Sequence, residues 1–134
     1  MGRLRLLFPL LALTSLALAL ISCGSSNTKL QSISITPPTA DSKDYTNGQV
    51  QYTAAGTYND GTQVKPLTVL WSSGPPWLAP RPIQVSGNGI ASCGTSPAGT
   101  YPVWAGAPTS QSTPVSMMNQ STPMVTATAQ LTCP

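Results

Sequence analysis

Apolar and polar residues alternate in short runs along most of the chain after residue 29, and each run ends at turn-forming residues. Period-two alternation is typical of strands that bury one face. The pattern predicts strands at residues 30–36, 48–58, 64–71, 83–86, 90–93, 99–105 and 124–133. No segment after residue 29 shows a helical period, so about seven short strands predict an all-β fold, a β-sandwich of two sheets.

The stretch from Gly56 to Ser73 is expected to form two strands around an Asn59-Asp60-Gly61 turn. Asp-Gly between alternating runs is a strong hairpin signal, because the central turn positions can need positive φ. Pro66 interrupts the second run and predicts an edge position or a bulge. Apolar residues on the predicted inner faces give a candidate core of Ile33, Ile35, Tyr52, Val69 and Trp71. Trp71 is the largest of these side chains and is expected to fill the centre of the core.

Two segments differ in composition from the strands. Residues 106–123 are rich in Ser, Thr, Pro and Gln and lack charge, which predicts a long insert that is either functional or disordered, with disorder favoured. Residues 74–82 form a proline-rich crossing that contains Trp77. Trp77 either packs against one end of the core, the interpretation we favour, or stacks on a sugar ligand.

The N-terminus has the composition of a secretory signal. Arg3 and Arg5 precede an apolar run, Leu6 to Ile21, and small residues follow it. The run is short for a bilayer-spanning helix, which needs about 20 residues. The organisation expected is therefore a leader at 1–22, a flexible tether at 23–28, and a sandwich at 29–134.

Leu20-Ile21-Ser22-Cys23 resembles the lipobox of bacterial lipoproteins. The resemblance implies cleavage before Cys23, acylation of its sulfur and amine, and stable anchoring by more than one acyl chain. Gly24, in place of the aspartate that retains such proteins at the inner membrane, favours the outer membrane of the cell envelope. The alternatives are an uncleaved membrane anchor and an ordinary cleaved signal that leaves Cys23 as a thiol.

The remaining two cysteines predict a disulfide. With Cys23 acylated, Cys93 and Cys133 can pair only with each other, and an oxidising compartment favours the bond. Two buried thiols are the alternative.

Composition excludes much chemistry. The chain has no histidine, and its acidic residues are Asp41, Asp44 and Asp60, all in polar turns. We therefore expect no catalytic residues, no metal site and no cofactor. Beyond the leader, the charges of four basic residues are nearly balanced by these three aspartates, so no basic patch for nucleic acid is expected.

Three stretches resemble the bacterial Ig-like group 2 (BIG2-type) domain: Leu30 to Pro37, Gln51 to Thr62, and Leu70 to Ser73. The resemblance implies that the chain folds as an extracytoplasmic immunoglobulin-like β-sandwich of about seven strands, of the kind used as spacer or adhesion modules. The hypothesis is a non-enzymatic, lipid-anchored envelope module with a structural role or with a protein or glycan ligand. The alternative is an accessory subunit of an envelope or secretion assembly that docks through residues 106–123.

Overall fold

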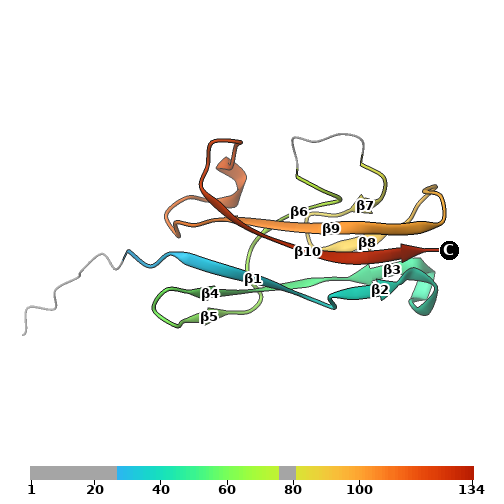
Figure 1. The fold of residues 1–134 in the computed structure, drawn as a ribbon, viewed down its shortest axis with the longest axis horizontal. Coiled ribbons are helices and arrows are strands. Elements are labelled where there is room, and N and C mark those ends of the chain that lie inside the picture. The colour runs from blue at the N-terminus through green and yellow to red at the C-terminus, as the bar shows by residue number, and fades with distance from the viewer. Residues whose placement is uncertain (1–26, 76–80) are drawn as a thin grey trace, which may run out of the picture.

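The computed structural model describes residues 27–75 and 81–134, and these fold as an all-β sandwich of two layers (Figure 1). The leader, Cys23 and Trp77 lie outside the described residues. Short 3₁₀ turns are the helical elements of the described part: η1 (Ser42–Asp44), η2 (Thr46–Gly48) and η3 (Val115–Met117).

The first layer is a sheet in the order β2-β10-β9-β6. Its members are β2 (Thr39–Asp41), β10 (Met124–Cys133), β9 (Gly99–Pro108) and β6 (Leu70–Ser72). β9 and β10 pair antiparallel over their whole length, from Gly99 opposite Cys133 to Pro108 opposite Met124. β2 runs parallel to β10 on the other side.

The second layer consists of two sheets that share one nearly continuous strand. β3 (Gln49–Gln51) and β4 (Thr53–Tyr58) are separated by Tyr52 alone. β4 pairs with β1 (Leu30–Thr36) and β5 (Gln63–Val64), whereas β3 pairs with β8 (Ile90–Ser92), which pairs with β7 (Gln84–Val85). With β3 and β4 counted as one strand, the order matches an immunoglobulin-like sandwich.

The core lies between the layers and is made by the inward residues of both. Tyr52 is its largest fully buried side chain, and its phenol donates a hydrogen bond of 2.9 Å to the carbonyl oxygen of Gln130. Burial raises the pKa of Tyr52 to about 12, so the phenol stays a donor at neutral pH. This bond joins β10 to the opposite layer. Of the other predicted core residues, Ile35 and Val69 are buried, whereas Ile33 packs partly buried against the core.

The predicted hairpin ending at Trp71 is wrong in its second half. The Asn59-Asp60-Gly61 turn does join β4 to β5, but β6 pairs with β9 in the other layer. Pro66 has no N–H to continue the β4 ladder, and Leu67 makes one further bond to Ala54 O at 2.8 Å. The chain then crosses between the layers.

Trp71 is only partly buried, so it is not the central plug that its alternation suggested. Trp104 is the more buried indole, 5 % exposed, and it lies on the outer face of β9. Its neighbours Val103 and Ala105 face the core, which places Trp104 on the opposite side.

The predicted insert is shorter and more ordered than its composition indicated. β9 continues to Pro108, so the connection to β10 is Thr109 to Pro123, and Thr109 N donates to Pro123 O at 3.0 Å. Asn119 caps a turn within it, accepting a bond from Ser121 N at 2.9 Å. Local side-chain hydrogen bonds of this kind order a segment that has little apolar surface to bury.

Cys93 and Cys133 are bonded, with Cα atoms 5.7 Å apart. The bond joins the residue after β8 to the end of β10, and so links the two layers at the end of the sandwich opposite the insert (Figure 1).

Replacing both cysteines, Cys93→Ser and Cys133→Ser, should lower the free energy of unfolding by about 2–4 kcal/mol, because the bond closes a long loop in the unfolded chain. Urea denaturation of the wild type and the double variant measures the difference. With reductant present the two proteins should unfold at the same urea concentration. Equal stability without reductant would contradict a stabilising disulfide.

Gly106→Ala should destabilise the sandwich by about 1–3 kcal/mol, because overpacking forces side chains and backbone to shift. A Cβ at this position would lie 2.2 Å from Cη2 of Trp104. Thermal unfolding checks the prediction, with Gly87→Ala as the matched control because nothing lies within 4 Å of its Cβ. In a Trp104→Leu background the penalty should shrink; an unchanged penalty would show that the indole is not its cause.

Candidate functional site

A notch in the second layer forms a hollow that a tryptophan lines. β8 pairs with the strand that contains Tyr52, and this pairing ends at a hydrogen bond of 2.8 Å from Tyr52 N to Gly89 O. The segment after β5 bonds to the same strand further along, where Leu67 N donates to Ala54 O. Between these two bonds neither partner covers the strand on this side, and a groove of about 270 Å³ opens.

Trp71 lies in the wall of this groove and comes from β6, in the opposite layer. The groove is therefore a gap in the second layer that exposes the inward-facing indole of Trp71. This gap explains why Trp71 is only partly buried. Only glycine fits at position 89 beside this gap. Its φ is +84°, and a Cβ there would lie 2.9 Å from Cε2 of Trp71 and 2.6 Å from Tyr52 O.

The rim of the groove is polar and uncharged. Gln51 Nε2 donates to the carbonyl oxygens of Tyr52 and Asn88, each at 2.8 Å, so the side chain fixes the β7–β8 turn against the strand. Asn88 Oδ1 accepts a bond from Ser86 Oγ. Within the described part of the chain, Gln51 Oε1 and Asn88 Nδ2 have no such partner, and Thr53 and Thr68 also line the groove.

The groove therefore offers one indole, amide donors and acceptors, and hydroxyls. Among the described residues that line it, the only ionisable group is the Tyr52 phenol, whose pKa burial raises to about 12 and which donates its proton to Gln130 O. Such a surface binds a neutral ligand by stacking and hydrogen bonds. It contains no activated nucleophile and no acid–base pair.

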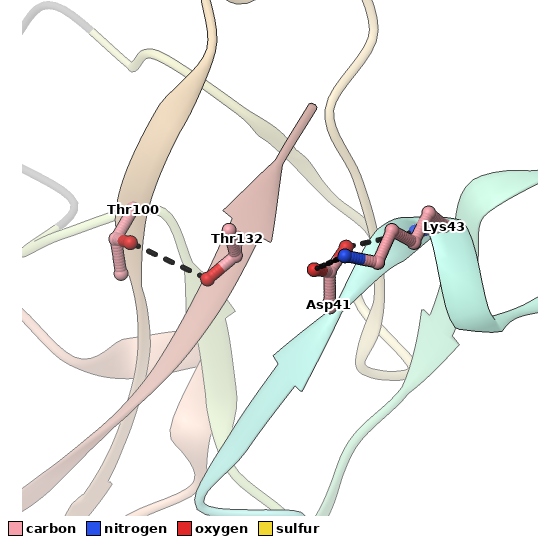
Figure 2. Close-up of polar contacts among 4 residues, drawn as sticks. All are labelled: Asp41, Lys43, Thr100 and Thr132. Carbon is pink, nitrogen blue, oxygen red and sulfur yellow. Dashed lines mark hydrogen bonds and ion pairs between the residues drawn. The ribbon is translucent and has the colours of Figure 1, made fainter.

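A second hollow, at the end of the sandwich that carries the C-terminus, is lined by Asp41, Asp44, Tyr45 and Thr132. Figure 2 shows polar contacts of two of its lining residues, Asp41 and Thr132. Thr100 and Thr132 lie side by side on β9 and β10 with hydroxyl oxygens 3.3 Å apart, and Lys43 reaches Asp41. The Lys43 Nζ to Asp41 Oδ2 distance is 2.9 Å, and this contact lowers the pKa of the Asp41 carboxyl. Lys43 is exposed, so the pair contributes little to stability.

The three aspartates do not converge. Asp60 lies in the β4–β5 turn, where its carboxylate accepts a bond from Thr62 N at 2.9 Å, while Asp41 pairs with Thr132 near the end of β10. These are opposite ends of the sandwich (Figure 1). Among residues 27–75 and 81–134 no three metal-ligating side chains cluster.

Of the residues predicted from sequence, Tyr52, Val69 and Trp71 meet at the groove, whereas Ile33 and Ile35 belong to the core alone. The rim residues Gln51, Thr68 and Asn88 were not predicted. The Gly87-Asn88-Gly89 turn was the available signal, since glycines there allow the close approach to Trp71.

No family model matches this chain, and neither does any curated protein. In the part of the chain that the structure describes, no helix has the length and apolar character required to cross a membrane.

Proposed function

We propose that this protein is a non-enzymatic, lipid-anchored module of the bacterial cell envelope, of the bacterial Ig-like group 2 type, that binds a neutral ligand in the Trp71 groove. The observation that carries the binding role is the uncharged groove with an indole wall and unpaired amide groups at its rim. A glycan suits it best, because sugar rings stack on aromatic faces and sugar hydroxyls pair with amides.

The lipid anchor is supported by the residues that lead to Cys23, which match a lipobox behind a basic and apolar leader. The disulfide between Cys93 and Cys133 supports export, since such bonds persist in oxidising compartments. Acylation would hold the sandwich close to the membrane on the short polar tether before Lys29.

The alternative function, an accessory subunit that docks through the insert, has one observation in its favour. Met117, at the tip of the insert, is 70 % exposed, which is unusual for a large apolar side chain.

Growing a bacterium that expresses the full chain with an alkyne analogue of palmitate should label the protein at Cys23. Cys23→Ser should lose the label and move from the membrane fraction to the soluble fraction. A Cys93→Ser variant is the matched control and should keep both. Label retained by Cys23→Ser would defeat the lipid anchor.

Binding of the detergent-solubilised, acylated protein to an array of neutral bacterial glycans tests the groove. Gln51→Ala and Thr68→Ala should each weaken binding by about 5-fold, the effect of one hydrogen bond of about 1 kcal/mol. Trp71→Phe should weaken it further through loss of the indole face. Gln63→Ala, an exposed glutamine outside the groove, should bind as the wild type does.

Trp77→Ala distinguishes the groove from a second aromatic site. If this variant loses binding while the Trp71 and Gln51 variants retain it, the ligand stacks on Trp77 and the groove is not the site. The absence of any array signal would leave a structural role for the module and would contradict the binding part of the proposal.

A further inference from the structure

The insert and the membrane tether lie at the same end of the sandwich. Leu30 N, at the start of β1, donates to Thr109 O at 2.9 Å, and Lys29 forms a β-bridge with Ser110. In Figure 1 the connection between β9 and β10 rises beside the point where the N-terminal segment reaches β1, while the C-terminus lies at the opposite end. The first and last residues of the insert are therefore fixed beside the tether.

The place where the tether joins the sandwich is also fixed. Asn59, in the β4–β5 turn, accepts a bond from Lys29 N at 3.0 Å and donates its own N–H to Lys29 O, also at 3.0 Å. The side-chain nitrogen of Asn59, Nδ2, donates to Asn27 O at 3.2 Å. Cys23 precedes Asn27 by four residues, so the Cα atoms of these residues are at most about 14 Å apart even with the chain fully extended, and a lipid would be attached within that reach.

The insert presents an exposed methionine, Met117, on an uncharged turn. No residue from Thr109 to Pro123 is ionisable. Turn η3 is closed by bonds from Met117 N to Pro114 O at 3.0 Å and from Met118 N to Val115 O at 3.2 Å. Met117 projects from this turn, and Val115 beside it is half-buried. Removing such a tip from water involves no desolvation of a charged side chain.

We propose that Met117 and the η3 turn contact the phospholipid bilayer to which Cys23 anchors the protein. This inference rests on the anchor of the proposed function. One methionine would not hold a protein on a membrane from solution, but a short tether raises the effective concentration of the two surfaces to the millimolar range. A weak apolar contact is then sufficient to set which flank of the sandwich faces the bilayer.

The opposite end of the sandwich lacks these properties. Tyr45 is the other exposed large hydrophobic residue among those described, and it lies next to Asp44 and close to Asp41. β9 and β10, ten residues each, separate the two ends by about 33 Å. Lys43 offsets the charge of Asp41, and the carboxylate of Asp44 remains at this end. Anionic headgroups repel that carboxylate, so a membrane contact at the η1–η2 end is disfavoured.

Collisional quenching by lipids with brominated chains tests the contact. A fluorophore is attached at Ser116→Cys in the full-length, acylated protein, which leaves Met117 in place. The new thiol is unique because Cys23 is acylated and Cys93 is bonded to Cys133. In vesicles of phosphatidylethanolamine and phosphatidylglycerol, emission at this site should fall at least 2-fold, whereas the same label at Thr46→Cys should be little affected.

The variant Met117→Asp in the Ser116→Cys background should abolish this difference while the protein still floats with the vesicles. Equal quenching at the two label sites in floating protein would overturn the contact and leave the anchor intact. Protein that fails to float would overturn both. Shielding of the label by envelope proteins but not by pure lipid would overturn the membrane contact in favour of a docking segment.

Discussion

The pairing of β9 with β10 is the constraint on which the rest of the structure depends. These strands pair over ten residues without a register shift, and the connection between them is fifteen residues long. Closing a connection of that length costs more entropy than closing a two-residue turn, although the cost rises only slowly with length. The disulfide at Cys133 and the Tyr52 bond to Gln130 both hold β10 from the opposite layer, so the strand is fixed against the core.

The same pairing separates the molecule into two ends of different character. One end carries Lys29, where the predicted tether joins β1, together with the Asn59 turn and the uncharged insert. The other carries the disulfide and the turns that contain Asp41 and Asp44. Because strands β9 and β10 run the full length between them, the position of the insert relative to the tether follows from the topology and does not depend on the conformation of the insert itself.

Local pattern predicted the elements better than it predicted their partners. The alternation of Met124 to Cys133 gave the last strand with its observed bounds, and Asp60-Gly61 gave the turn after β4. Trp71 and Trp104 both stand in strands, and sequence alone could not decide between them. The face of Trp104 depends on the register of β9, and Gly106 beside it supplies the space for its indole on the outer face. A one-residue change in register would have exchanged the two faces.

The groove could not be predicted because it is a gap between partners. It exists where β8 stops pairing at Tyr52 and where Pro66 has already ended the β5 ladder, and these two events are far apart in sequence. The disulfide, by contrast, followed from counting: with Cys23 assigned to lipid, only one pairing remained. A disulfide between two remaining cysteines can be predicted from sequence because few pairings are possible. A groove that depends on where two strands stop pairing cannot be predicted in this way.

The segment from Pro66 to Thr68 connects the two surfaces to which function is assigned. It lines the Trp71 groove on one side, and on the other it lines a hollow of about 370 Å³ that the insert closes with Pro114 and Val115. The segment has one backbone bond to β4, from Leu67, and no long ladder to resist displacement. A shift of this segment would alter both hollows, because it lines each of them. The proline that ends the β5 ladder thus opens the groove and also leaves its rim adjacent to the insert.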